Sequence, residues 1–298
     1  MATSHLSLPP EIVLKVIQWL PFQDGKEIAS LKAIPYLKEL IEAYEYSITH
    51  WFMSRELRHA QVDFPYCQKL NLNWLAQCVS SYDMIDAIML ELTWRENCVS
   101  IEPHNTAAAN AGLLLLHHMA RILPLDPLIA IYIVLHHATL TARYHGKGWI
   151  NQRTYGRFMD SNQLSLRNEL EFCFAEATLS IGADFLHDML VNPCDPSGET
   201  TLMNHYLDHG LHDWNHPCWG DEKGEFQPPR TQGPQREEGT KPRTLFTTLL
   251  ERMAELEECE LEEVRSRIEA RIDRFDHTLA FLSLDGKERL LRGLDLEW

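Results

Sequence analysis

The stretch "LSLPPEIVLKVIQWLPFQD" (Leu6–Asp24) has more apolar surface than one short helix buries against its own domain. Pro9 and Pro10 suit the start of a helix, and Glu11 lies where the helix dipole favours an acid. At about 100° per residue, the apolar side chains fill one broad arc and the polar ones a strip of about 60°. The apolar arc contains Ile12, Val13, Leu14, Val16, Ile17, Trp19 and Leu20, and the strip contains Glu11, Lys15 and Gln18. We therefore expect this helix to be covered on two sides, by its own domain and by a partner.

The order of these residues resembles the opening of an F-box, which begins Leu-Pro-x-Glu, continues with aliphatic residues and reaches a second Leu-Pro-like turn and an Asp. The matching positions are Leu8, Pro9, Glu11, Ile12, Leu14, Val16, Ile17, Leu20, Pro21 and Asp24. Aliphatic residues at helical spacing continue to Ile41, but the Val-Cys-x-x-Trp-like block of the family is absent. Pro35 stands where many members continue a helix. The resemblance covers about residues 6–50.

This resemblance implies a three-helix module, residues 1–52, that binds a Skp-family adaptor of a cullin-type ubiquitin ligase. The implied partner-binding residues are Leu8, Pro9, Ile12, Val16, Ile17 and Leu20. The rest of the chain would then capture a target protein that the sequence does not identify, and the chain itself would carry out no catalysis. The alternative is that residues 6–50 are only the first helices of one large helical scaffold without a ligase role.

Composition restricts the class of protein further. The chain has 298 residues, 45% of them hydrophobic, and a formal net charge of −16. An acidic chain repels phosphate groups, so we expect neither nucleic acid nor an anionic membrane as a partner. Seven dispersed cysteines without CxxC spacing suit a reducing compartment, and the amino terminus has no secretory signal pattern. We therefore expect an intracellular protein of the cytoplasm, the nucleus or both.

Helix signals fill the remainder of the chain, and strand signals are almost absent, so we expect an all-α fold. Helices are predicted around 73–93, 163–181 and 184–191, with Gly182 as a break. The stretch 106–144 predicts an antiparallel helical pair, in which Asp126 is expected to cap the second helix and Pro127 to lie in its first turn. Whether this pair lines a ligand pocket is left open by the sequence.

The domain plan follows from changes in composition. Residues 53–219 are predicted to form a helical domain that is the candidate substrate-binding part. Residues 220–243 concentrate Gly, Pro and charge, which predicts a flexible linker. Residues 244–298 are predicted to be an amphipathic helical segment, as one helix or two in series, because the apolar stripe shifts near Glu260.

A cluster of histidines near position 210 suggests an alternative, metal-dependent function. The candidate ligands are His205, His209, His212, Asp213 and His216. Imidazoles spaced by three and four residues share one face of a helix and can converge on a transition metal. The His187–Asp188 and His212–Asp213 pairs are similar to the dyad of helical HD phosphohydrolases, with His117, His118, His136 or His137 as a further ligand. The histidines between His187 and His216 therefore suggest an HD-like hydrolase as the rival function.

Other signals are weaker. "GAD" and "DPSGETTLM", between Gly182 and Met203, are similar to the punctuation of ankyrin repeats, which implies at most one degenerate helical unit. Glu169, Glu171 and Glu176 share one predicted helix, where solvation explains their charges. Familiar nucleophile, phosphate-loop and dinucleotide motifs are missing from the sequence, so no cofactor and no catalytic residue are assigned.

Overall fold

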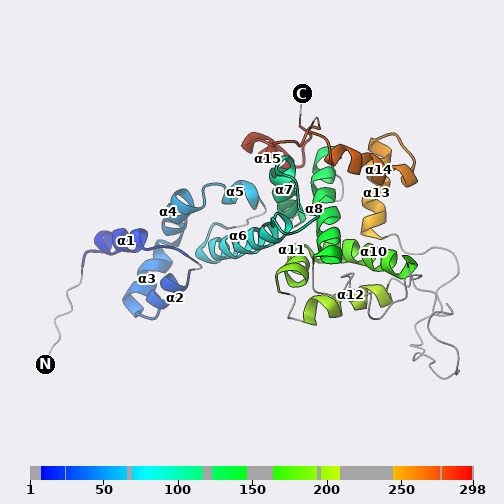
Figure 1. Ribbon diagram of the computed structural model, residues 1–298. Coiled ribbons are helices and arrows are strands. Elements are labelled where there is room, and N and C mark those ends of the chain that lie inside the picture. The colour runs from blue at the N-terminus through cyan, green and yellow to red at the C-terminus, as the bar shows by residue number, and fades with distance from the viewer. Residues whose placement is uncertain are drawn as a thin grey trace, which may run out of the picture.

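Every regular element in the described part of the chain is helical. This computed structural model describes residues 8–23, 25–65, 69–116, 123–145, 164–192, 196–208, 244–275 and 277–296. These ranges contain 14 α-helices and two short turns of other helix types, and no strand (Figure 1). The expected all-α class is therefore confirmed. The linker predicted at 220–243 lies outside the described residues.

Four helices form a small module at the amino-terminal end of the protein. They are α1 (Pro10–Trp19), α2 (Lys26–Leu31), α3 (Pro35–Ala43) and α4 (Glu45–Glu56). Pro10 and Pro35 each lie in the first turn of their helix, where a missing N–H is tolerated. The module has a core of its own, made by Ile17, Phe22, Ile28, Ile41, Ile48, Phe52 and Met53 together with Leu72 and Leu75. Four helices thus occupy the region for which three were expected, and α4 continues to Glu56.

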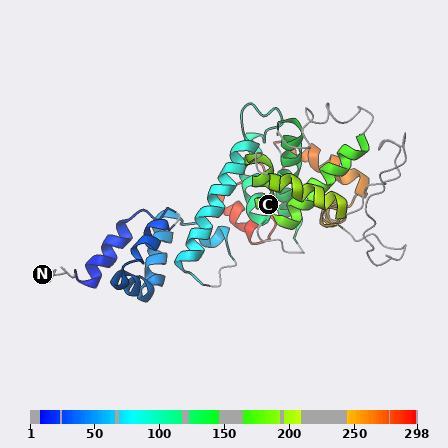
Figure 2. The ribbon, with the colours of Figure 1, turned by 90° about the horizontal axis from the view of Figure 1, so that it is seen from below.

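One long helix links this module to the rest of the protein. The short helix α5 (Ala60–Asp63) is followed by the long helix α6 (Leu72–Leu92). The side chain of Asn71 caps α6 by accepting the Trp74 N–H at 2.7 Å. Leu72 and Leu75 in its first turns belong to the core of the module, whereas Cys78 and the buried residues from Ile85 onward belong to a larger second core. Figures 1 and 2 show the module at one end of an elongated molecule, with α6 leading to the larger helical body.

The centre of the larger body is the predicted helical pair. A single turn of 3-10 helix, η1 (Pro103–Asn105), leads into α7 (Thr106–Leu116), which packs against α8 (Leu125–Tyr144). A Cβ atom on Gly112 would lie only 2.2 Å from the Ala130 carbonyl oxygen, so the two backbones are in direct contact. By length and composition α8 could cross a membrane, but 72% of its apolar window is buried inside the protein, as in the central helix of many soluble proteins.

Three further segments cover one end of this pair. They are α10 (Leu164–Ile181), α11 (Ala183–Leu186), which continues into the π-helical turn η2 (His187–Val191), and α12 (Pro196–Asp208). Gly182 separates α10 from α11 with a φ of 96°, a left-handed conformation that glycine adopts without strain. The predicted helices at 163–181 and 184–191, and the break between them, are therefore confirmed.

The carboxyl-terminal segment forms three helices. They are α13 (Leu245–Leu256), α14 (Leu261–Ile272) and α15 (Leu284–Leu291). The chain turns between α13 and α14, and Glu260 is the residue that precedes α14. The arrangement of two helices in series is confirmed, with the break where the apolar stripe shifts. The third helix, α15, was not predicted as a separate element.

Asp126 does not cap α8 as expected. The helix begins at Leu125 after Pro124, and its start has no side-chain cap. The Asp126 carboxylate instead accepts the Thr278 hydroxyl at 2.7 Å and the Leu296 N–H at 2.8 Å. Asp126 is almost fully buried, so these hydrogen bonds satisfy a charge that would otherwise be costly to bury. Its role is to attach the end of the chain to α8.

Candidate protein-docking surface

Four apolar side chains form an exposed row along one side of α1, which we call the α1 stripe. The exposed fractions are 50% for Leu8, 44% for Ile12, 54% for Val16 and 76% for Trp19. Ile12, Val16 and Trp19 are four and three residues apart, which places them above one another on the helix, and Leu8 lies just before the start of the helix. Single exposed apolar residues are ordinary, but a contiguous row is typical of a surface that meets another protein.

The opposite side of α1 faces its own module. Ile17 is only 2% exposed and belongs to the module core, and Val13 and Leu14 pack against that core while partly buried. The six sequence-predicted partner residues therefore divide into three groups. Leu8, Pro9, Ile12 and Val16 are exposed, Leu20 is partly buried and Ile17 is buried. Ile17 thus serves the module's core, and the surface available to a partner is the α1 stripe.

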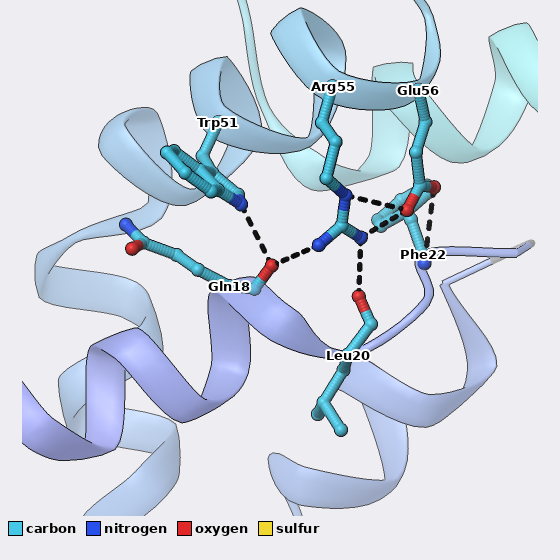
Figure 3. Close-up of polar contacts among 6 residues, drawn as sticks. All are labelled: Gln18, Leu20, Phe22, Trp51, Arg55 and Glu56. Atoms are coloured by element: carbon cyan, nitrogen blue, oxygen red, sulfur yellow. Dashed lines mark hydrogen bonds and ion pairs between the residues drawn. The ribbon is translucent and has the colours of Figure 1, made fainter.

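Two side chains of α4 hold the carboxyl-terminal end of α1 (Figure 3). The Gln18 carbonyl oxygen accepts hydrogen bonds from Trp51 Nε1 at 2.8 Å and from the Arg55 guanidinium at 2.5 Å. Arg55 also donates to the Leu20 carbonyl at 2.6 Å. The last carbonyls of a helix have no partner within it, and a cation there opposes the negative end of the helix dipole. Trp51 and Arg55 therefore complete the end of α1 that carries Trp19.

The neighbouring residue Glu56 extends this contact to the turn after α1. Its carboxylate accepts the Phe22 N–H at 3.3 Å and also pairs with the guanidinium of Arg55. The Arg55 guanidinium lies 5.2 Å from the ring centroid of Phe52, a core residue of α4. Two consecutive side chains of α4 thus hold the chain from Gln18 to Phe22.

The histidine cluster is described only in part. His209, His212, Asp213 and His216 lie outside the described residues, and His205 on α12 lies 3.5 Å from the Ser180 hydroxyl. His187 Nδ1 lies 3.9 Å from the Asp188 carboxylate oxygen Oδ1. Among the residues that the structure describes, no three His, Cys, Asp or Glu side chains lie close enough together to hold a metal ion. The described part of the cluster therefore gives the metal hypothesis no support.

The two histidines of α8 belong to polar contacts between helices. The Glu269 carboxylate of α14 accepts the Tyr132 hydroxyl at 2.8 Å and lies 3.4 Å from His136 Nδ1. The hydrogen bond from His136 contributes most to lowering the pKa of Glu269. His137 donates from Nδ1 to the Val99 carbonyl, and burial lowers its pKa to about 4 from 6.5. These contacts join α8 to its neighbours.

A cleft of about 960 Å³ opens where the module meets the start of α6. Its lining combines acidic, amide and aromatic side chains, among them Glu42, Glu45, Tyr46, Gln61, Phe64 and Asn71. None of its lining residues comes from the helical pair at 106–144.

Comparison with known proteins gave no relatives: no family model, no curated protein and no solved structure matches the chain. The F-box resemblance therefore rests on the residues of this chain alone.

Three residues that form or support this surface were not among the predicted partner-binding positions. Trp19 was included in the apolar arc but not among the partner-binding residues, and it is the most exposed residue of the α1 stripe. The signal that could have identified Trp19 is its spacing of seven and three residues from Ile12 and Val16, which places it on the same side of the helix. Trp51 and Arg55 act on α1 from more than 30 positions away, and no local pattern identifies such contacts.

Proposed function

We propose that this chain is an F-box-type substrate receptor that joins a target protein to a Skp-family adaptor of a cullin-type ubiquitin ligase. In this proposal the module α1–α4 binds the adaptor, and the larger helical body captures the target. The observation that carries the proposal is the α1 stripe, since α1 presents apolar side chains to solvent beside the face that it buries.

The size of the stripe sets a limit on what it contributes. Burying one large apolar side chain completely is worth about 1.5 to 3 kcal/mol. The four stripe residues are roughly half exposed, so covering them would contribute about 3 to 6 kcal/mol. Association costs about 4 to 15 kcal/mol. The gain from the stripe reaches only the lower end of that cost, so we expect the adaptor also to cover further exposed apolar side chains of the module, such as Ile34 and Tyr36.

The division of the protein into two cores supports a two-part function. The module keeps its own core around Phe22 and Phe52, and the larger body is built around α8. A partner that covers the α1 stripe would therefore not need to disturb the larger body. The sequence similar to ankyrin punctuation, between Gly182 and Met203, belongs to that body.

The experiment is co-expression with a Skp-family adaptor, followed by purification of the complex. We expect the wild-type chain to retain the adaptor and the Leu8→Ala, Ile12→Ala double variant to lose it, with an unchanged circular dichroism spectrum. A matched control replaces two comparably exposed apolar residues of the larger body, Leu90 and Ile181, with alanine. That control is expected to retain the adaptor.

Two outcomes would contradict the proposal. If the wild-type chain does not retain the adaptor, the non-ligase scaffold becomes the better description. If untagged protein contains about one equivalent of Zn, Mn, Fe or Ni, the HD-like hydrolase becomes the better description.

A further inference from the structure

The α1 helix has few internal reasons to stay in place. It has 10 residues, fewer than the roughly 12 to 15 that an isolated helix needs for marginal stability in water. Ile17 is its only fully buried side chain, and its start has no side-chain cap. Its main neighbours are α3 and α4. The position of the α1 stripe therefore depends strongly on the contacts that α4 makes with the end of α1.

Those contacts are made by Arg55 and Trp51, which share the Gln18 carbonyl as acceptor. Arg55 alone reaches two carbonyls, of Gln18 and Leu20, which lie on either side of Trp19 in the sequence. A planar guanidinium can donate to two acceptors at once, which a lysine ammonium does not do with the same geometry. Figure 3 shows the guanidinium between the two carbonyls and the Glu56 carboxylate.

We propose that Arg55, assisted by Trp51, is the positioning residue for adaptor binding: it holds the carboxyl-terminal half of α1 so that Val16 and Trp19 meet the partner together. This inference rests on the proposed function. Arg55 acts through α1 and does not itself belong to the α1 stripe. The docking surface is therefore positioned by a polar contact at the carboxyl-terminal end of the helix.

The test compares Arg55→Met, Arg55→Lys and Trp51→Phe with wild type for binding to purified Skp-family adaptor by calorimetry. Methionine keeps an apolar chain near Phe52 but removes every donor, and phenylalanine keeps the ring but removes the Nε1 donor. We expect a loss in affinity of at least tenfold for Arg55→Met, about threefold for Trp51→Phe and an intermediate loss for Arg55→Lys. The control is Arg58→Met, because Arg58 lies just after α4 and donates to the Ser54 carbonyl of α4 rather than to α1, and this variant is expected to bind as wild type does.

Amide hydrogen exchange separates positioning from general destabilisation. In Arg55→Met we expect faster exchange at Ile17 and Gln18 and unchanged exchange at Ile48 and Phe52. Wild-type affinity in Arg55→Met, or faster exchange at Ile48 and Phe52 as well, would overturn the inference. If wild type itself does not bind the adaptor, the proposed function fails. Unchanged exchange at Ile17 and Gln18 in Arg55→Met would instead show that Arg55 does not hold α1.

Discussion

The Glu176 carboxylate on α10 accepts the Phe246 N–H at the start of α13, at 2.8 Å. Its other oxygen accepts the Leu245 N–H at 3.1 Å, and Glu176 is almost fully buried. The first N–H groups of a helix have no partner within it, so a carboxylate there satisfies two of them and also faces the positive end of the dipole. Solvation, which the sequence suggested for this acid, is therefore the wrong explanation for Glu176.

Glu176→Gln is expected to lower the free energy of unfolding by about 1 to 3 kcal/mol, because charged hydrogen bonds to buried donors are replaced by neutral ones. Urea unfolding followed by circular dichroism measures the change. The exposed Glu262 of α14 provides the control, and Glu262→Gln should stay within about 0.5 kcal/mol of wild type. Equal stability of the two variants would show that Glu176 does not anchor α13.

Gly112→Ala should destabilise the larger body strongly, because the new methyl group would lie 2.2 Å from the Ala130 carbonyl and force α7 and α8 apart. Overpacking of this kind costs about 1 to 3 kcal/mol or more. Thermal unfolding is the measurement. The neighbouring change Ala107→Gly, at a partly exposed position of α7, should cost no more than about 1 kcal/mol. A stability of Gly112→Ala equal to that of wild type would contradict the close packing of the pair.

His137 should make the protein less stable in mild acid. Its pKa is about 4 in the folded chain, because of burial, and about 6.5 in the unfolded chain. Between these values only the unfolded chain binds the proton, so the contribution of His137 to stability falls as the pH drops from 6.5 to 4 and is constant above 6.5. Each pKa unit of difference between the folded and unfolded chains is worth about 1.4 kcal/mol, so the free energy of unfolding should fall by about 3 kcal/mol in total.

The measurement is urea unfolding of wild type and His137→Gln at several pH values between 7 and 4. The stability difference between the two chains should shrink or reverse as the pH falls. His59→Gln, which makes the same substitution at an exposed position, is the control. Parallel curves for wild type and His137→Gln would exclude the effect.

Under the proposed function, Trp19→Ala should weaken adaptor binding about tenfold and leave stability almost unchanged. Tryptophan is among the residues that contribute most to interfaces, and this one is 76% exposed in the free chain. Calorimetry measures the affinity and thermal unfolding the stability. Trp94→Ala, which removes an exposed tryptophan of the larger body, should bind the adaptor as wild type does. Equal affinity of Trp19→Ala and Trp94→Ala for the adaptor would show that Trp19 is not part of the docking surface.

Local patterns in the sequence predicted much of the fold. The break at Gly182 and the interruption near Glu260 both appear in the structure, because a glycine and a shift of the apolar stripe act within a few residues. The two apolar sides of α1 also follow from periodicity. Periodicity alone did not show which side would be buried, since that depends on where α3 and α4 pack.

The polar contacts between distant helices could not be predicted. Asp126 was interpreted as a helix cap and Glu176 as a solvated acid, because their partners lie 152 and 70 positions away. The Arg55 contact with Gln18 spans 37 positions. A buried carboxylate or guanidinium has no sequence signature of its own, so only the packed structure identifies its partner.

The unbroken course of α6 has a consequence for how the molecule presents its two ends. Leu75 belongs to one core and Cys78 to the other, with only two residues of the same helix between them. Each residue inserted there would rotate one end against the other by about 100° and move it by about 1.5 Å. The number of residues in this helix therefore sets the angle between the module and the larger body.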